Sequence, residues 1–167
     1  MGDEANTTPH VRTATKADLE VVARLAAQLV RLHHAWDPLR FMISEPIEEG
    51  YRWWLGRELS NAKAVVLVGC ASDAPDAPVL GYAYGRLEER DWNALLDVHG
   101  ALHDILVEEG ERGRGVARAM LDEMVKRLKD MGAPRVVLHT ASHNERAQRF
   151  FKSAGFRPTM IEMTRES

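Results

Sequence analysis

Cysteine is almost absent from this chain of 167 residues, which contains only Cys70. A single cysteine cannot form an internal disulfide, so we expect Cys70 to be structural and the protein to work in the reducing cytoplasm. No apolar run approaches the roughly 20 residues that a membrane-spanning helix needs, and the first residues lack the charged and apolar blocks of a signal peptide. The formal net charge is only −3. We therefore expect neither a membrane nor a nucleic-acid partner.

The rest of the composition is that of an ordinary globular protein. Apolar residues make up 45% of the chain and charged residues 28%, and a chain of this length suffices for one hydrophobic core. We expect a single domain over residues 10–167, preceded by a disordered polar tail over residues 1–9.

Hydrophobic periodicity predicts a mixed α/β chain, with antiparallel strands early and strands alternating with helices late. The expected strands are 10–14, 62–70, 79–87, 101–107, 135–139 and 156–164. The expected helices are 16–34, 45–59, 116–131 and a last one that a capping box at Ser142–Glu145 opens and that runs to Ala154. Gly81 or Gly85 is expected to mark a bulge in the third strand.

The stretch from Ile105 to Leu121 is the most informative part of the chain. An apolar strand runs into an acidic turn, and a loop containing Gly113 and Gly115 then opens directly into a helix. The backbone N–H groups of such a loop point the same way, and together with the helix dipole they form a seat for phosphate. Glycine lets the backbone come close to the anion. The stretch therefore predicts a phosphate-binding loop.

Two common phosphate loops do not fit this stretch. Gly110-x-x-x-x-Gly115 matches the first half of a nucleoside-triphosphate loop, but Val116 and Ala117 stand where Lys and Ser/Thr are required. Gly113-x-Gly115 begins a dinucleotide fingerprint, but Arg118 stands in place of the third glycine.

A third template fits. Residues 112–117, RGRGVA, resemble the Arg/Gln-x-x-Gly-x-Gly/Ala loop of the GNAT superfamily of N-acetyltransferases. Residues 144–156, NERAQRFFKSAGF, resemble the second signature of the same superfamily, Asn-x-x-Ala-x-x-Phe-Tyr-x-x-x-Gly-Phe. The matching positions of the second signature are Asn144, Ala147, Phe150, Gly155 and Phe156. Both signatures stand in the expected order, and the similarity covers roughly residues 12–164.

The resemblance implies an α/β (α+β) fold in which about four helices flank a mixed, mostly antiparallel sheet. The sheet splays open between its fourth and fifth strands, here 101–107 and 135–139, and acetyl-CoA binds in the opening. The backbone of Leu106 and Val107 would pair with the pantetheine arm, Asn144 would hydrogen-bond it, and Phe150 and Phe151 would flank it. The pyrophosphate would bind the amides of Arg112, Gly113, Arg114, Gly115, Val116 and Ala117, with help from Arg118.

The resemblance further implies an enzyme, an N-acetyltransferase in which a primary amine attacks acetyl-CoA directly within a ternary complex. One position departs from the family pattern. Phe151 stands where the family often has the tyrosine that protonates the leaving thiolate, and a phenylalanine has no proton to give. The alternative is therefore a module of the same fold that binds acyl-CoA without turnover.

The attacking amine must lose a proton, and the sequence offers two candidate bases. His103 and Asp104 occupy the place of an acidic pair found before the phosphate loop in several family members. Because a strand alternates its faces, we expect only one of them to point at the acceptor, with His103 on the face of Ile105 and Val107. Imidazole is a suitable base at neutral pH, whereas Asp104, if it is not the base, would either bind the positive charge of the amine or pair with a neighbouring strand.

The resemblance also implies that the link between the first two helices lines the entrance for the acceptor amine. The residues expected to line it are His33, His34, Trp36, Asp37 and Phe41. His33 and His34 point to different helix faces and no third ligand stands at a familiar spacing, so we expect no metal.

The acceptor itself is expected to be a small-molecule or peptide amine. The acids of residues 88–97 favour a cationic acceptor only weakly, since a solvated surface is their ordinary role. A homodimer is compatible with the last strand and with the pair Trp53–Trp54, which would supply its interface.

Overall fold

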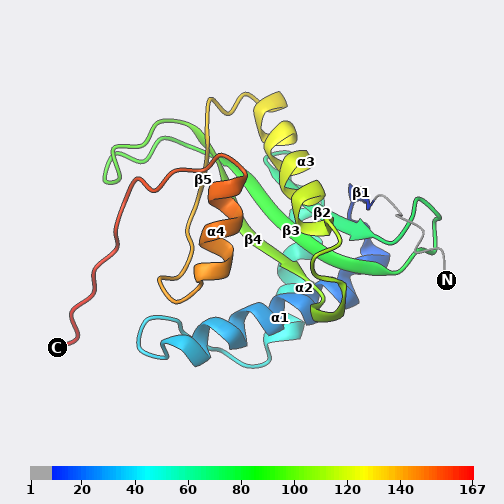
Figure 1. The fold of residues 1–167 in the computed structure, drawn as a ribbon, viewed down its shortest axis with the longest axis horizontal. Coiled ribbons are helices and arrows are strands. Elements are labelled where there is room, and N and C mark those ends of the chain that lie inside the picture. The colour runs from blue at the N-terminus through cyan, green and yellow to red at the C-terminus, as the bar shows by residue number, and fades with distance from the viewer. Residues whose placement is uncertain (1–8) are drawn as a thin grey trace.

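The computed structural model describes residues 9–167, so that the predicted tail over residues 1–9 lies outside it except for Pro9. Its centre is one sheet with the strand order β1-β2-β3-β4-β5 (Figure 1). The strands are β1 (His10–Thr13), β2 (Ala64–Cys70), β3 (Val79–Glu88), β4 (His99–Val107) and β5 (Val136–Leu138). Neighbouring strands from β1 to β4 pair antiparallel, and β5 pairs parallel to β4. The predicted mixed, mostly antiparallel sheet is confirmed.

Four helices flank the sheet, as predicted. They are α1 (Leu19–Trp36), α2 (Ile47–Glu58), α3 (Val116–Asp130) and α4 (Glu145–Ser153), with short 3-10 turns at Lys16–Asp18 and Glu109–Glu111. The α1 and α2 helices pack on the sheet face that carries Tyr82 and Tyr84. The α3 and α4 helices cover the face that carries Leu67 and Leu102 (Figure 1). Each face thus has its own hydrophobic core.

The α3 helix connects the two parallel strands and fixes the position of the loop before it. Its buried side chains recur every three or four residues, so one side of the helix is apolar. They are Val116, Met120, Leu121, Met124 and Leu128. Because this stripe packs on the sheet, the first turn of α3 lies beside the end of β4.

The sheet opens between β4 and β5. The parallel pairing joins Gly100–Leu102 to Val136–Leu138. The β5 strand ends at Leu138, but β4 continues to Val107. Within the described residues 9–167, the second half of β4 therefore has β3 on one side and no strand on the other, and the predicted splay is confirmed.

Two predictions about the C-terminal region are wrong. No strand forms over residues 156–164, where the chain is extended and leads away from the sheet (Figure 1). Pro158 has no N–H to donate, and the nearby edge strand β5 is only three residues long, so the segment has too few backbone partners to form a strand. Asn144, not Ser142, caps α4, because its Oδ1 accepts the N–H of Ala147 at 3.1 Å.

The two elements predicted to form a homodimer interface, the pair Trp53–Trp54 and the last strand, differ from the expectation. Trp54 lies inward, with its ring 4.8 Å from that of Tyr84, whereas Trp53 is exposed. The last strand does not form, and Met160, Ile161 and Met163 are exposed.

A buried ion pair fastens β1 to the start of α1. The guanidinium of Arg12 donates two hydrogen bonds to the carboxylate of Asp18, at 2.7 and 2.8 Å, and the side chain of Asp18 is only 8% exposed. The backbone N–H of Thr15 also donates to this carboxylate, at 2.7 Å. These interactions, the hydrogen bond from Arg12 above all, lower the pKa of Asp18 to about 2.

We expect Asp18→Asn to lower the free energy of unfolding at pH 7 by about 2 kcal/mol. The folded-state pKa lies below the unfolded value of about 3.9, so the carboxylate stabilises the fold above that value and the stabilisation is lost as the pH falls toward about 2. Urea unfolding between pH 7 and pH 2 measures this. Asp130→Asn, which removes an exposed pair with Lys126, is the control and should change stability little. A difference between wild type and Asp18→Asn that does not depend on pH would contradict the prediction.

Candidate active site

The loop before α3 presents a row of free backbone donors. Gly113 and Gly115 have φ angles of +84° and +82°, a left-handed conformation that glycine adopts without strain. Among residues 9–167, none provides a hydrogen-bond acceptor for the six N–H groups from Gly113 to Arg118. Six consecutive donors at the positive end of a helix dipole fit the phosphate groups expected from the sequence.

The arginines of this loop are engaged elsewhere. Arg112 Nε donates to the backbone oxygen of Val107 at 3.3 Å. Arg114 pairs with Glu111 at 2.6 Å and Arg118 with Asp122 at 3.0 Å, both near the surface. Since exposed ion pairs contribute little, an incoming anion can replace these carboxylates at small cost.

The free edge of β4 lies next to this loop. Glu108 N–H donates to Leu80 O in β3, at 2.8 Å. Because the hydrogen-bonding groups of a strand alternate in direction, those of Leu106 also face β3, whereas those of Ile105 and Val107 face the opening. Of the two residues predicted to pair with a ligand arm, only Val107 presents its backbone groups there.

A hollow with a cavity volume of about 70 Å³, open to solvent, lies where β4 and β5 part. Four regions line it, namely β4, the end of β5 with the two residues after it, α4 and α1. Lining residues include His103, Ile105, His139, Asn144, Phe151 and His33. The second signature thus faces the same opening as the free edge of β4.

Residues of the second signature differ in what they offer to this hollow. Asn144 uses its Oδ1 to cap α4, which leaves its Nδ2 hydrogens for other acceptors. Phe151 is buried, and its ring lies 5.2 Å from Phe150 and 5.9 Å from Phe156. Phe150 packs against the core beside it and is not part of the lining.

A bulge in β4 corrects the expectation that His103 and Asp104 point to opposite faces. Tyr84 pairs with Asp104 but Gly85 pairs with Leu102, so His103 is an extra residue without a partner in β3. A bulge turns a side chain away from strict alternation. The ring of His103 therefore stacks on Tyr84 at 5.4 Å, on the face where Asp104 also lies. The bulge predicted in the third strand lies beside Gly81, because Gly69 pairs with Gly81 but Cys70 pairs with Val79, which leaves Leu80 as the extra residue of β3.

Asp104 is bound to its neighbour on β3. The hydroxyl of Tyr82 donates to its Oδ2 at 3.1 Å. Burial raises the pKa of Asp104 above that of an ordinary aspartate, and the hydrogen bond from Tyr82 offsets this only in part. Of the two candidate bases, His103 is the one that lines the hollow, with a side chain that is 43% exposed.

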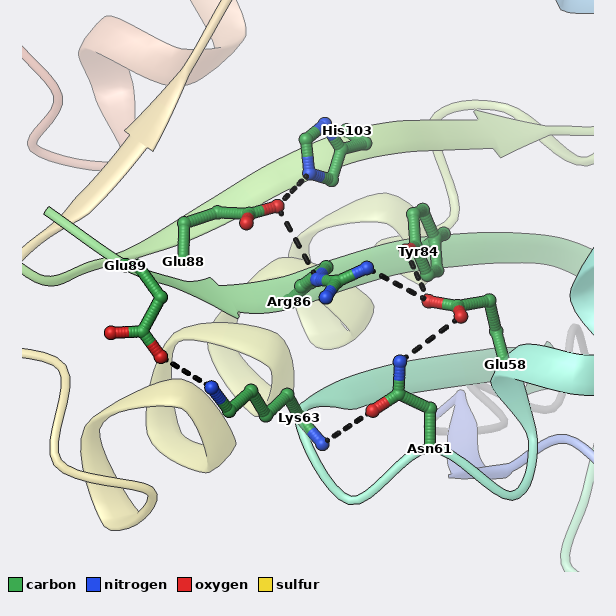
Figure 2. Close-up of polar contacts among 8 residues, drawn as sticks. All are labelled: Glu58, Asn61, Lys63, Tyr84, Arg86, Glu88, Glu89 and His103. Carbon is green, nitrogen blue, oxygen red and sulfur yellow. Dashed lines mark hydrogen bonds and ion pairs between the residues drawn. The ribbon is translucent and has the colours of Figure 1, made fainter. Parts of the chain in front are cut away.

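Glu88 is a site residue that sequence reasoning did not single out. Its Oε1 lies 3.1 Å from Nε2 of His103 (Figure 2). The neighbouring Glu89 instead pairs with Lys63 at the surface (Figure 2). In the sequence both belong to one acidic run. Only their positions relative to the strand show that Glu88 contacts His103 and Glu89 contacts Lys63.

The residues predicted to line the acceptor side divide into two groups. His33 lines the hollow, and its ring lies 5.0 Å from those of Trp36 and Phe41. His34 and Asp37 instead hold the loop after α1. His34 Nδ1 lies 2.7 Å from the oxygen of Phe41, and Asp37 Oδ1 accepts the backbone N–H groups of Leu39 and Arg40.

The described part of the chain, residues 9–167, contains no group of three or more His, Cys, Asp and Glu side chains arranged to hold a metal ion. None of its helices has the length and apolar character that crossing a membrane requires.

A sheet splayed beside a glycine-containing loop that opens a helix, with the second signature facing the opening, is the arrangement that the resemblance to the acetyltransferases implies. A model of the acetyltransferase (GNAT) family matches residues 27–156. The chain belongs to this family, and the resemblance inferred from its two signatures is confirmed.

Individual curated relatives match only part of this chain. The uncharacterized N-acetyltransferase YdgE of Bacillus subtilis (strain 168) is 34% identical over 58 residues, which cover 35% of this chain and 37% of that protein. Matches to curated relatives span from 21% to 58% of the relatives' own lengths.

Two solved structures share the fold over nearly the whole chain. A tetramutant of the BH1408 protein of Bacillus halodurans has a TM-score of 0.80 at 24% identity, covering 95% of this chain and 99% of that one. AAC(6')-Iy in complex with the bisubstrate analog CoA-S-monomethyl-acetylneamine has a TM-score of 0.74 at 18% identity, covering 96% and 98%. At these identities the likeness shows the fold alone.

Proposed function

We propose that this protein is an acetyl-CoA-dependent N-acetyltransferase that acetylates a primary amine of a small molecule or peptide. One observation carries the proposal. Six N–H groups from Gly113 to Arg118, which have no partner among residues 9–167, lie a few residues after a strand whose edge is free toward a hollow. A ligand with a phosphate end and an amide-containing arm fits this combination.

The chain's own residues would hold acetyl-CoA along this line. The amides from Gly113 to Arg118 would bind the pyrophosphate, and the backbone oxygen of Val107 would accept a hydrogen bond from the arm. Asn144 would donate from Nδ2 to a carbonyl of the arm, and Phe151 would pack against it. The structurally similar AAC(6')-Iy, whose bound analog joins CoA to an aminoglycoside derivative, supports this direction.

The chemistry requires a neutral amine. An amine with a pKa near 10 is mostly protonated at pH 7, so a base must take its proton. We assign this role to His103. The amine nitrogen forms a bond to the thioester carbonyl carbon, the C–S bond breaks, and the electron pair leaves with sulfur. A backbone N–H at Val107 would polarise the carbonyl.

Phe151 is the observation that favours the second candidate, an acyl-CoA-binding module without turnover. It occupies the hollow as an apolar ring and supplies no proton to a leaving thiolate. If the protein is an N-acetyltransferase, the thiolate takes its proton from solvent, since a thiolate is a tolerable leaving group at neutral pH.

Two assays in parallel test the proposal. We expect CoA at a hundred times its dissociation constant to stabilise the fold by about 2.7 kcal/mol, measured as a rise in melting temperature. We expect thiol release from acetyl-CoA only when an amine of the accepted class is added. Stabilisation without release from any amine of a broad panel supports the binding module. No stabilisation at all contradicts the assignment of the loop.

A further inference from the structure

His103 is held on two sides. Glu88 Oε1 lies 3.1 Å from its Nε2, and the ring of Tyr84 stacks on its face at 5.4 Å with an interplanar angle of 24° (Figure 2). Both contacts come from β3, where Tyr84 and Glu88 each lie two residues from Arg86. The imidazole therefore has a fixed plane and one fixed hydrogen bond.

Glu88 is in turn held by a network on the same strand. Arg86 Nε lies 3.5 Å from Glu88 Oε1, and Arg86 Nη1 lies 3.7 Å from Glu58 Oε2. Tyr84 donates to Glu58 at 2.6 Å, so the residue that stacks on His103 belongs to the same network (Figure 2). Burial alone would raise the pKa of Glu58, but hydrogen bonds from Tyr84 and Asn61 outweigh it and lower the pKa.

The hydrogen bond to Glu88 decides which ring nitrogen of His103 carries the hydrogen. A glutamate at neutral pH is ionised and can only accept. A neutral imidazole that contacts it through Nε2 therefore carries its hydrogen there. Nδ1 has no hydrogen-bond partner among residues 9–167, and it points away from Glu88 (Figure 2).

We propose that Glu88 is a positioning residue that holds His103 as the Nε2–H form, so that Nδ1 is the atom that accepts the proton of the acceptor amine. This inference rests on the proposed function. Nδ1 first takes one proton from the protonated amine and passes it to solvent. As the C–N bond then forms and the C–S bond breaks, a second proton moves from the same nitrogen to Nδ1. The imidazolium keeps its Nε2–H bond to the carboxylate and then returns the Nδ1 proton to solvent, while the departing thiolate takes a proton from solvent.

The first test needs no activity. Correlation spectra of the ¹⁵N-labelled histidine rings at pH 8, where an ordinary imidazole is neutral, distinguish Nε2–H from Nδ1–H. The His103 signals are assigned by their loss in His103→Ala. We expect a single Nε2–H form in wild type and in the control Glu89→Gln, whose carboxylate pairs with Lys63 instead. We expect altered His103 signals in Glu88→Gln. Identical His103 spectra in wild type and Glu88→Gln would overturn the proposal.

The second test is a double-mutant cycle in turnover. We expect Glu88→Gln to lower kcat about tenfold, part of the 10²–10⁴ that acid–base catalysis contributes, with KM for acetyl-CoA unchanged. In a His103→Ala background the same substitution should have no further effect, because Glu88 acts through His103. Multiplying effects would refute the proposed role. If no amine is acetylated, the proposed enzyme fails, and the spectra alone decide whether Glu88 positions His103.

Discussion

Gly115→Glu is expected to weaken CoA binding at least a hundredfold, a loss of about 2.7 kcal/mol. The substitution puts a carboxylate among the N–H groups that we assign to the pyrophosphate, where it competes for the donors and repels the phosphates. The added side chain has room, since the nearest atom to a Cβ at this position is Pro9 Cγ at 3.8 Å. Calorimetric titration with CoA measures the effect.

The chain offers a matched control for the strain of this substitution. Gly132 also has a positive φ, +99°, follows the other end of α3, and has no atom within 4 Å of its Cβ position. Gly132→Glu therefore adds the same side chain at a similar backbone cost, about 1 kcal/mol, away from the loop. Equal affinities for wild type and Gly115→Glu would contradict the assignment, and equal losses in both variants would make strain the cause.

His103→Ala is expected to lower kcat about a hundredfold, within the range of one acid–base group, while the dissociation constant of CoA stays the same. The imidazole lines the hollow and is 43% exposed, so its removal leaves the core intact. Steady-state kinetics with the accepted amine and titration with CoA give the two numbers.

Asp104→Asn separates the two candidate bases in the same assay. Asp104 accepts the hydroxyl of Tyr82 and an asparagine can keep that hydrogen bond, so we expect a smaller loss than for His103→Ala. The reverse order, with the larger loss in Asp104→Asn, would move the role of base to Asp104.

The sequence predicts the scaffold well because its signals are local. The apolar stripe of α3 and the glycines at 113 and 115 are read from neighbouring residues, and both stand as expected. Strand pairing is not local. Gly85 lies opposite a bulge whose extra residue is His103 on β4, and only the register shows that this histidine shares a face with Asp104.

The predictions that failed also depend on pairing between residues that are far apart in the sequence. The sequence predicts a strand over residues 156–164, but a strand also needs a partner, and β5 provides only three residues. The sequence alone does not show that Glu88 and Glu89 have different partners, because both belong to one acidic run. One reaches His103 and the other Lys63, because β3 ends between them.

Because Arg112 donates a hydrogen bond to the backbone oxygen of Val107, a side chain of the protein competes with the ligand for that oxygen. The backbone oxygen that we assign to the arm of CoA already accepts a hydrogen bond from Arg112. Ligand binding there is an exchange of partners rather than a new bond, so its net free energy is small. A phosphate that attracts Arg112 would release that oxygen at the same moment. A single guanidinium would then couple the two ends of one ligand, with the phosphate end arriving first and the arm following.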